Sequence, residues 1–414
     1  MSWSRNSPAS SDFHRVVVTG AGIVSPMGMD FAENAAGFRA GRSAFSPVTL
    51  FDVSRQRVGT AGQVDLAETC AGLPHRAASR MDRGTRLAWL AAREALSAAG
   101  LSGGAMPMVV GTSAAAMPIG EDYYRAAHLP QTTSRSQLRR VETYQAQRQI
   151  TDMARLLGVD GRIRVVSNAC ASGANAIGQA FHLVRMGRAE RVLAGGYDAL
   201  CQLVFAGFDT LQALSPSGIP RPFDAARDGL ALGEGAGFMV VESAASAKSR
   251  GARVIAEITG YGAATDIHHL TQPHPEGDAA LVTMSAACAM AGIAPEQIDY
   301  INSHGTGTPL NDVAEGNAIR RWAGDRVSSI KVSSTKSAIG HLLGGAGAVE
   351  SVICLMAMEG QWLPASLHVR EPDPVCAFDL IREPREARVA RALTNSFGFG
   401  GANATLIFAK EGLP

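Results

Sequence analysis

The chain has 414 residues, of which 46% are hydrophobic and 18% are charged, and its formal net charge is +1. This length supports a large hydrophobic core, and the balanced charge gives no electrostatic reason to expect nucleic acid or a membrane surface as a partner. The six cysteines form no CxxC pair and have no histidine at ligand spacing, which argues against a disulfide framework and a zinc site. A reducing, cytoplasmic location fits this cysteine usage better.

The N-terminal residues 1–12 are polar and contain no apolar core of the kind found in signal peptides. We therefore expect a disordered leader before the folded part of the chain. No apolar stretch approaches the length of a transmembrane helix. Both observations predict a soluble protein that has no membrane partner.

Short apolar runs rich in β-branched residues recur along the chain, and stretches with helical periodicity separate them. The runs predict strands at 15–20, 106–113, 163–169, 191–198, 237–243 and 254–262. The periodic stretches predict helices that include 83–99, 145–158 and 173–187. Continuous apolar strands that alternate with helices are typical of a sheet buried between helical layers, an α/β fold.

The first predicted strand leads into "VTGAGIVSPMG", which begins like a dinucleotide-binding loop. Gly20 and Gly22 fit that pattern, but Ser25 stands where the third glycine belongs, and no acidic residue follows at the expected distance. A tight turn explains these glycines better than nucleotide binding does.

The same rhythm restarts near residue 253. It predicts a helix at 277–292, strands within 298–305 and at the start of 328–351, and closing strands near 390–397 and 404–409. The segments "RIRVVSNACASGANAIGQAF" and "SIKVSSTKSAIGHLLGGAGAVE" both run from a strand through a small polar corner into a helix of small residues. This likeness predicts two similar halves, 13–252 and 253–414, that share one compact body.

Cys170 lies in "VVSNACASGANAIGQA", where a predicted strand ends and a helix begins. The N–H groups and the dipole at a helix start favour a thiolate, so we expect a lowered thiol pKa at this position. The small neighbours would let a substrate carbonyl approach the sulfur. The competing interpretation is a buried structural cysteine, which is the usual fate of this residue type and our expectation for the other five.

A second cluster is "NSHGTGTPLNDVAE", in which His304 follows a predicted strand. A histidine on a Gly-Thr loop at the carboxyl end of a strand is where α/β enzymes place catalytic groups. An isolated histidine is more often structural. The hydroxyls of Thr306 and Thr308 either bind a polar part of a substrate or cap the loop.

A third cluster is "SSTKSAIGHLLGGAGAVE". Lys336 stands at the strand end that mirrors Cys170, and His341 follows five residues later. A lysine among small and apolar residues needs a carboxylate partner if it is buried, and Glu350 on the same helical stretch is the candidate. The alternative is an exposed lysine at the end of a strand.

A fourth cluster is "NSFGFGGANATLIF", in which glycines surround Phe397 and Phe399. A glycine-flanked aromatic residue can move as a gate, and its backbone N–H can face a pocket. The alternative is a β-bulge with two core phenylalanines. Together the four clusters supply a nucleophile, two imidazoles, a buried cation and a mobile aromatic loop, which acyl transfer through a carbanion requires.

In this order and spacing, the four motifs resemble those of the elongating β-ketoacyl-acyl-carrier-protein synthases, types I and II, of the thiolase superfamily. The resemblance runs from "RVVVTGAGIVSPMG" to "NSFGFGGANATLIF". It implies a thiolase-like, five-layered αβαβα fold and a dimer, with a homodimer expected and a heterodimer left open. It also implies acyl carrier protein as the partner, and no metal or organic cofactor for the reaction.

The resemblance assigns a role to each catalytic candidate. Cys170 would be the nucleophile, His304 and His341 would serve the decarboxylation of a malonyl thioester, and Lys336 with Glu350 would hold the electrostatics of the site. The backbone N–H groups of Cys170 and Phe399 would form the oxyanion hole, and the Phe399 ring would gate the second substrate. The implied substrate-binding residues are Thr271, Thr306 and Thr308 for the phosphopantetheine arm, and Phe208 and Phe397 beside the pocket.

The implied reaction is a decarboxylative Claisen condensation of acyl-Cys170 with malonyl-carrier protein, which yields 3-ketoacyl-carrier protein and CO2 in fatty-acid elongation. A ketosynthase of a specialised polyketide or polyene pathway shares this chemistry and remains the alternative. A chain-length factor would lack the nucleophile, a thiolase would carry a second catalytic cysteine, and an initiating synthase would lack the Lys336–His341 pairing.

Three segments depart from the family pattern or add to it. "GTSAAAMPIG" at 111–120 replaces a Gly-Ile-Gly-like segment near the acyl pocket, and the usually apolar, dimer-facing stretch is polar at 134–149. Both departures suggest an unusual chain-length preference or partner subunit. Six arginines form either a docking patch for an acidic carrier protein or ordinary solvated charge, namely Arg76, Arg80, Arg83, Arg135, Arg139 and Arg140.

Overall fold

A computed structural model describes residues 13–66, 72–74, 78, 80–128 and 141–413. The predicted leader at 1–12 therefore lies outside the described residues. Strands of the main sheet are β1 (Val16–Val24), β4 (Met108–Gly111), β5 (Ile163–Val166), β6 (Arg191–Asp198), β7 (Gly235–Ser243), β8 (Ala256–Thr265), β9 (Tyr300–Asn302), β10 (Lys331–Ser333), β12 (Asp379–Leu380), β14 (Arg391–Phe397) and β15 (Ala402–Ala409). Two short ribbons pair β2 (Ser46–Pro47) with β3 (Thr60–Ala61), and β11 (Trp362–Leu363) with β13 (Arg385–Glu386).

Helices connect and cover these strands. They are α1 (Phe31–Arg39), α3 (Arg83–Ala98), α4 (Met117–His128), α6 (Ala146–Leu156), α7 (Ser172–Arg185), α8 (Gln202–Thr210), α9 (Ala244–Ser249), α10 (Asp278–Ala291), α11 (Pro309–Ala323), α12 (Lys336–Ile339) and α13 (Ala346–Gly360). Short 3-10 turns include η4 (Leu343–Gly345) and η5 (Phe399–Gly401).

The main sheet repeats one strand arrangement. Its order is β12-β10-β9-β14-β15-β8-β1-β7-β6-β4-β5. From β1 outward to β5, two antiparallel pairings are followed by two parallel ones, and the series from β8 outward to β10 is the same. The two series meet where β1 pairs with β8 at Val17–Glu257 and Val18–Ala256. This repeat supports the proposed division into 13–252 and 253–414, whose boundary stays a prediction.

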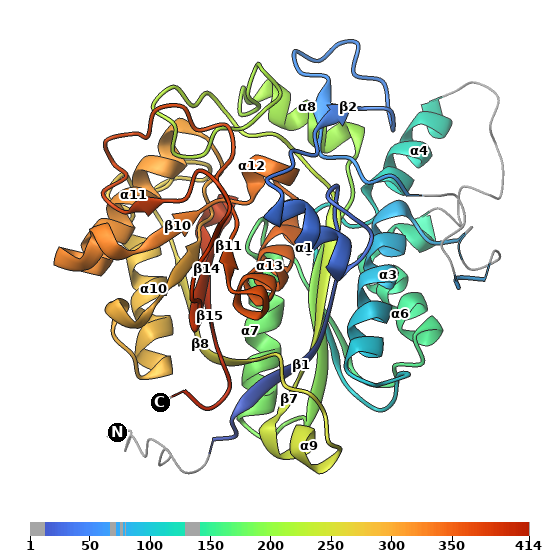
Figure 1. The fold of residues 1–414 in the computed structure, drawn as a ribbon. Helices are drawn as coiled ribbons and strands as arrows, with labels where there is room; N and C mark the ends of the chain where they lie inside the picture. Colours follow the sequence, from blue (N-terminus) through green and yellow to red (C-terminus); the bar gives the residue numbers. More distant parts are fainter. Residues whose placement is uncertain (1–12, 67–71, 75–77, 79, 129–140, 414) are drawn as a thin grey trace, which may run out of the picture.

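Helices lie on both outer faces and between the two series of strands (Figure 1). Helices α3 and α6 pack on the series that contains β1, and α10, with α11 against it, packs on the series that contains β8. Helices α7 and α13 contact each other and both sets of strands, so they form the central layer. The prediction of a thiolase-like αβαβα fold is confirmed.

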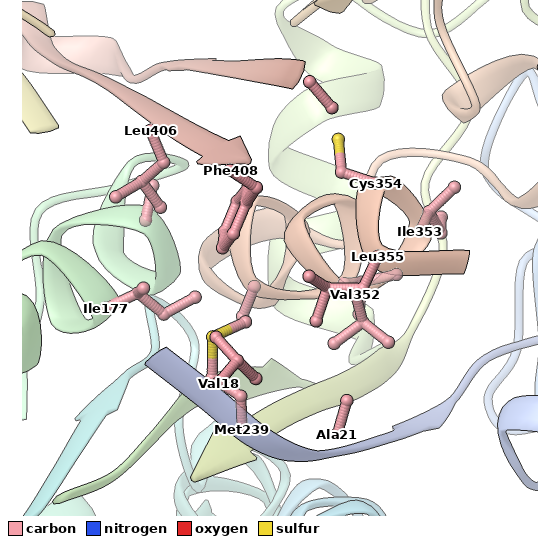
Figure 2. Packing of buried hydrophobic residues seen from close by; sticks show 14 of the residues in the cluster. Val18, Ala21, Ile177, Met239, Val352, Ile353, Cys354, Leu355, Leu406 and Phe408 are labelled. Carbon is pink, nitrogen blue, oxygen red and sulfur yellow. The ribbon is translucent and has the colours of Figure 1, made fainter. Parts of the chain in front are cut away.

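The central helix α13 is mostly apolar because strands and helices surround it, and Glu350 is the charged residue among its buried side chains. Figure 2 shows Val352 and Leu355 facing Val18 and Met239, with Phe408 above them. All five side chains are buried. In the described part of the chain, the stretch 343–360 has the length and hydropathy of a membrane span, contrary to the expectation from sequence, and 89% of it is buried inside the fold.

Two predicted strands are shorter than expected, and the residues that end them belong to the site. The strand predicted at 106–113 ends at Gly111, because Thr112 begins a turn whose N–H groups bind a buried carboxylate. The strand predicted at 163–169 ends at Val166, because Ala169 adopts a left-handed φ of +54°.

Candidate active site

Cys170 is held at a sharp corner between β5 and α7. Ala169 has a left-handed backbone, which is uncommon for a residue other than glycine and signals a constrained turn. The Ser172 hydroxyl closes the corner, since it accepts from Asn168 N at 2.9 Å and donates to Ala169 O at 2.6 Å. The thiol is 7% exposed and faces a cavity.

Helices α7 and α13 touch through glycines at their first turns. A Cβ on Gly173 would lie 2.8 Å from Ala348 N, and a Cβ on Gly347 would lie 2.9 Å from Ala174 N. Real Cβ atoms do not approach backbone this closely, so glycine is required at both positions. This contact brings the Cys170 corner next to the segment that carries Lys336 and the second imidazole.

Two histidines face the same cavity as the thiol. The ring centroids of His304 and His341 lie 5.3 Å apart with an interplanar angle of 85°. Glu315 of α11 accepts His304 N at 2.9 Å, and His341 N donates to Ala231 O at 2.7 Å. Burial and the nearby ammonium of Lys336 lower the pKa of both imidazoles well below 6.5, so both are neutral at neutral pH and each carries one N–H.

Lys336 and Glu350 form a buried pair behind the cavity wall. Lys336 Nζ donates to Glu350 Oε1, and the two side chains are 2% and 3% exposed. Burial raises the pKa of Glu350 to about 7, and the Lys336 ammonium opposes that shift. Neither side chain is among those that line the cavity. The pair therefore acts on the cavity through its electric field.

The electrostatics of the thiol differ from the expectation that a helix start lowers its pKa. Burial dominates and raises the pKa of Cys170 to about 11. The charge of Lys336 and the backbone N–H groups of Phe399 and Cys170 act in the opposite direction. The N–H groups of Cys170 and Phe399 thus favour the thiolate, but in the free protein desolvation has the larger effect on the thiol pKa.

The loop that carries Phe399 passes close to the nucleophile. A Cβ on Gly398 would lie 3.1 Å from both Cys170 N and Asn168 O, so glycine allows this approach. The Phe399 ring is 39% exposed and stacks on Phe208, with centroids 5.9 Å apart. Phe397 packs 5.6 Å from the ring of His304.

The cavity has a volume of about 390 Å³. It is lined by all of the predicted site residues except Lys336 and Glu350, namely Cys170, Phe208, Thr271, His304, Thr306, Thr308, His341, Phe397 and Phe399. The hydroxyls of Thr306 and Thr308 lie 2.9 Å apart and bond to each other. The structure therefore gathers residues from both halves of the chain around one space.

Some residues that shape the cavity were not predicted from the sequence. Glu315 holds the backbone of His304, and Arg227 donates to the carbonyl oxygens of Thr308 at 3.3 Å and Pro309 at 3.0 Å. Both side chains are buried, at 1% for the Glu315 residue and 5% for the Arg227 side chain. No local pattern marks them, because a buried charged residue and a solvated one look alike in a sequence.

The proposed arginine patch loses one member. Arg83 Nη2 lies 2.6 Å from Glu234 Oε1, and its side chain is only 16% exposed, because it reaches inward from the first turn of α3. Arg80 is exposed. The remaining members lie outside the described residues, namely Arg76, Arg135, Arg139 and Arg140.

If Cys170 is the acylated nucleophile that the sequence implies, replacement of Gly398 by alanine is expected to slow that acylation about tenfold or more, because the new Cβ displaces the 398–401 loop and its N–H from the sulfur. The acylation rate is measured by mixing the protein with an acyl-carrier thioester, quenching samples at set times and determining their intact mass. The matched control is Gly207→Ala, since a Cβ there meets no atom within 4 Å. Equal acylation rates for both variants would contradict the tight approach at Gly398.

Comparison with known proteins gives a consistent result over the whole chain. Residues 13–247 match the family model described as "Beta-ketoacyl synthase, N-terminal domain", and residues 255–370 match "Beta-ketoacyl synthase, C-terminal domain". The chain is 37% identical to the 3-oxoacyl-[acyl-carrier-protein] synthase 2 of Synechocystis sp., covering 97% of this chain and 99% of that protein. It is 36% identical to the synthase of the same name from Staphylococcus aureus, covering 96% and 98%.

Solved structures show the same likeness. The structure titled "The ishigamide ketosynthase/chain length factor" superposes with a TM-score of 0.88 at 36% identity, covering 97% of this chain and 100% of that chain. A chain of the structure titled "AntDE:AntF (apo): type II PKS acyl-carrier protein in complex with its ketosynthase bound to the hexaketide" superposes with a TM-score of 0.85 at 28% identity, covering 96% of this chain and 99% of that chain.

Proposed function

The chain belongs to the β-ketoacyl synthase family, and we propose that it elongates fatty acids as a 3-oxoacyl-acyl-carrier-protein synthase of type II. The observation that carries this proposal is the single cavity that holds the Cys170 thiol, the N–H groups aimed at it, and two neutral imidazoles. The enzyme is a condensing acyltransferase, which joins an acyl group on the thiol to a malonyl-derived carbanion.

In the first half-reaction, Cys170 Sγ attacks the thioester carbonyl of an acyl-carrier protein. The thiol proton passes through a neighbouring neutral imidazole to the departing pantetheine thiolate, which accounts for a thiol that is protonated in the free protein. The N–H groups of Cys170 and Phe399 already point at the sulfur, so they are placed to receive the oxyanion that forms beside it.

In the second half-reaction, a malonyl thioester occupies the same cavity and loses CO2. The electrons of the broken C–C bond form an enolate, whose oxygen accepts hydrogen bonds from His304 and His341. The enolate carbon then attacks the acyl-Cys170 carbonyl, the Cys170 thiolate departs, and it regains a proton from solvent. Neutral imidazoles suit this role because each donates an N–H without attracting the carboxylate that must leave.

Threonines at the cavity wall are proposed to bind the phosphopantetheine arm. Thr306, Thr308 and Thr271 offer hydroxyls to the amides of that arm. Arg227 fixes the loop that carries Thr306 and Thr308, because it donates to the carbonyl oxygens of Thr308 and Pro309. Phe208 and Phe399 close the apolar side of the passage, and rotation of Phe399 would open it to a second substrate.

The partner of the enzyme is proposed to be an acyl carrier protein in the cytoplasm. We also propose a homodimer, with a heterodimer as the alternative. Strand β5 supports a dimer, because it is the outermost strand of its side of the sheet and pairs only with β4 among the described strands. Three of its four residues are apolar, and an unpaired apolar edge is normally covered by another chain or element.

A specialised polyketide or polyene ketosynthase is the second candidate. It is favoured by the likeness to the ishigamide and AntDE:AntF structures. Its chemistry is the same, so the two candidates differ in the acyl chains that they accept.

The first experiment combines intact-mass analysis with product detection. The protein is incubated with a panel of acyl-carrier thioesters of different length and saturation, and malonyl-carrier protein is then added. Acylation followed by release of CO2 and 3-ketoacyl-carrier protein is the expected result. Saturated chains as the best substrates support fatty-acid elongation, and preference for ketoacyl or polyene chains favours the second candidate. Absence of acylation with every carrier would contradict both.

Replacement of either His304 or His341 by alanine is expected to lower the rate of CO2 release about 100-fold to 1,000-fold, the usual loss when one oxyanion donor is removed. Acylation of Cys170 should fall less, because the remaining imidazole can still carry the thiol proton. In the wild type, the lowered imidazole pKa keeps both rings neutral as the pH falls through 6.5, so CO2 release should show no loss at that pH. A decline with an apparent pKa near 6.5 would show that the rings titrate normally.

A further inference from the structure

Asp198 is a buried carboxylate that the mechanism above does not use. It ends β6 and is 0% exposed. Its Oδ1 accepts the Thr112 hydroxyl at 2.6 Å and the N–H groups of Ala114 and Ala115 at 3.0 Å each. The N–H of Ser113 reaches both oxygens, at 3.2 and 2.9 Å. No salt bridge to this carboxylate is present within the described residues, so the Thr112 hydroxyl and backbone N–H dipoles balance its charge.

The second oxygen of Asp198 holds the turn that follows one of the two imidazoles. Gly344 N donates to Asp198 Oδ2 at 2.6 Å, and Gly344 lies three residues after His341. A Cβ on Gly344 would lie 2.5 Å from Ser113 N and 2.9 Å from Asp198 Oδ2, so the turn rests directly on the carboxylate. Leu343, beside it, has a left-handed φ of +51°.

The backbone of His341 is held by its own hydrogen bonds and by the turn that follows it. Its own N–H donates to Ala231 O, and its carbonyl accepts Gly233 N at 3.0 Å, which fixes the residue itself. The turn at 343–345 needs the Asp198 bond to keep Leu343 in a backbone region that a leucine rarely adopts. Ala115, on the opposite side of the carboxylate, is in the same strained region with a φ of +48°.

We propose that Asp198 is a positioning residue for His341, which fixes the 341–344 turn against the 112–115 turn and thereby sets the imidazole for decarboxylation. This inference rests on the proposed function. Burial also raises the pKa of Asp198 to about 6, and strongly shifted pKa values cluster at functional sites. Asp198 itself does not line the cavity, so it reaches His341 through the turn, while its charge acts on Cys170 and raises the pKa of that thiol.

The test is an Asp198→Asn variant, in which the amide nitrogen is a donor and cannot accept the backbone N–H groups that the second carboxylate oxygen accepts. The turnover number for CO2 release from malonyl-carrier protein is expected to fall about tenfold to 100-fold, with KM within about twofold of the wild type. Acylation of Cys170, followed by intact mass, is expected to stay within about threefold and also reports that the variant is folded.

A matched control is Asp82→Asn. Asp82 is also buried, has a raised pKa, and accepts the N–H of Thr85 at 2.9 Å and its hydroxyl at 2.7 Å, but it sits at the start of the outer helix α3. It should not change CO2 release selectively. The second variant, Gly344→Ala, keeps the carboxylate and displaces the turn, so it should reproduce the selective loss if Asp198→Asn fails to fold.

Two results would overturn the inference while leaving the proposed function intact: unchanged CO2 release in Asp198→Asn and Gly344→Ala, or an equal loss of acylation and CO2 release in both. The same selective loss in Asp82→Asn would also overturn it, because the effect would then be general. Wild-type protein that releases no CO2 from malonyl-carrier protein would contradict the proposed function, and this inference with it.

Discussion

A Cys170→Ala variant is expected to take up no acyl group and to form 3-ketoacyl product about 10⁴-fold more slowly than the wild type, or slower still. The loss is large because the acyl group must be bonded to this sulfur before the enolate carbon can attack its carbonyl. The backbone N–H groups of Cys170 and Phe399 remain in place, but they then have no thioester to bind. Intact-mass analysis and product detection measure the two effects together.

Cys288→Ala is the matched control for this variant. Cys288 is buried in α10, and burial raises its pKa to about 11, the same value as for Cys170. It lies outside the cavity lining, so acylation should persist. Release of CO2 from malonyl-carrier protein should persist in Cys170→Ala, because both imidazoles remain. Acylation of the Cys170→Ala protein would place the nucleophile elsewhere.

A Lys336→Met variant is expected to lose about 3–5 kcal/mol of unfolding free energy. Methionine fills a similar volume, but the Glu350 carboxylate then has no cation, and its other oxygen already has no hydrogen-bond partner.

The charge of Lys336 also lowers the pKa of His304 and His341, so its removal should raise the pKa of both rings. Urea unfolding measures the stability, and the pH dependence of CO2 release measures the pKa of the two imidazole rings.

The loss of unfolding free energy in Lys336→Met should depend on pH, and the Glu350 pKa sets the direction of that dependence. Without Lys336, the Glu350 pKa in the folded state rises further above its ordinary value of 4.5. A raised folded pKa makes the protein less stable as the pH rises through it, so the deficit should be largest at pH 8 and should shrink toward pH 5. The double variant Lys336→Met/Glu350→Gln should recover much of the stability. Equal deficits in the single and double variants would show that the loss comes from packing.

The elements of the fold were largely predictable because continuous β-branched runs mark buried strands. The strand at 191–198 has the predicted bounds, and the helices at 83–98 and 172–185 differ from prediction by one or two residues. The ends of β4 and β5 were not predictable, because tertiary bonds to Asp198 and the corner at Ala169 terminate them. Each of these depends on residues that are distant in sequence or on a rare backbone conformation.

The site residues were identified through motifs, and their environment was not. Sequence proximity to a helix start suggested a lowered Cys170 pKa, whereas burial by residues from both halves of the chain raises it. Arg83 was grouped with surface arginines, although Glu234, more than one hundred residues away, draws it inward. The buried positions of Asp198 and Glu315 could not be predicted for the same reason, because burial is a property of the assembled fold.

The glycine contact between α7 and α13 has an electrostatic consequence. It sets the positive ends of two helix dipoles side by side, each equivalent to roughly half an elementary charge. Both ends contribute positive potential beside the Cys170 corner, and this contribution falls off within about one helical turn. This part of the field comes from the backbone, so it persists when a charged side chain is replaced. Even without Lys336, the enzyme would therefore retain a positive potential that draws electrons toward the sulfur.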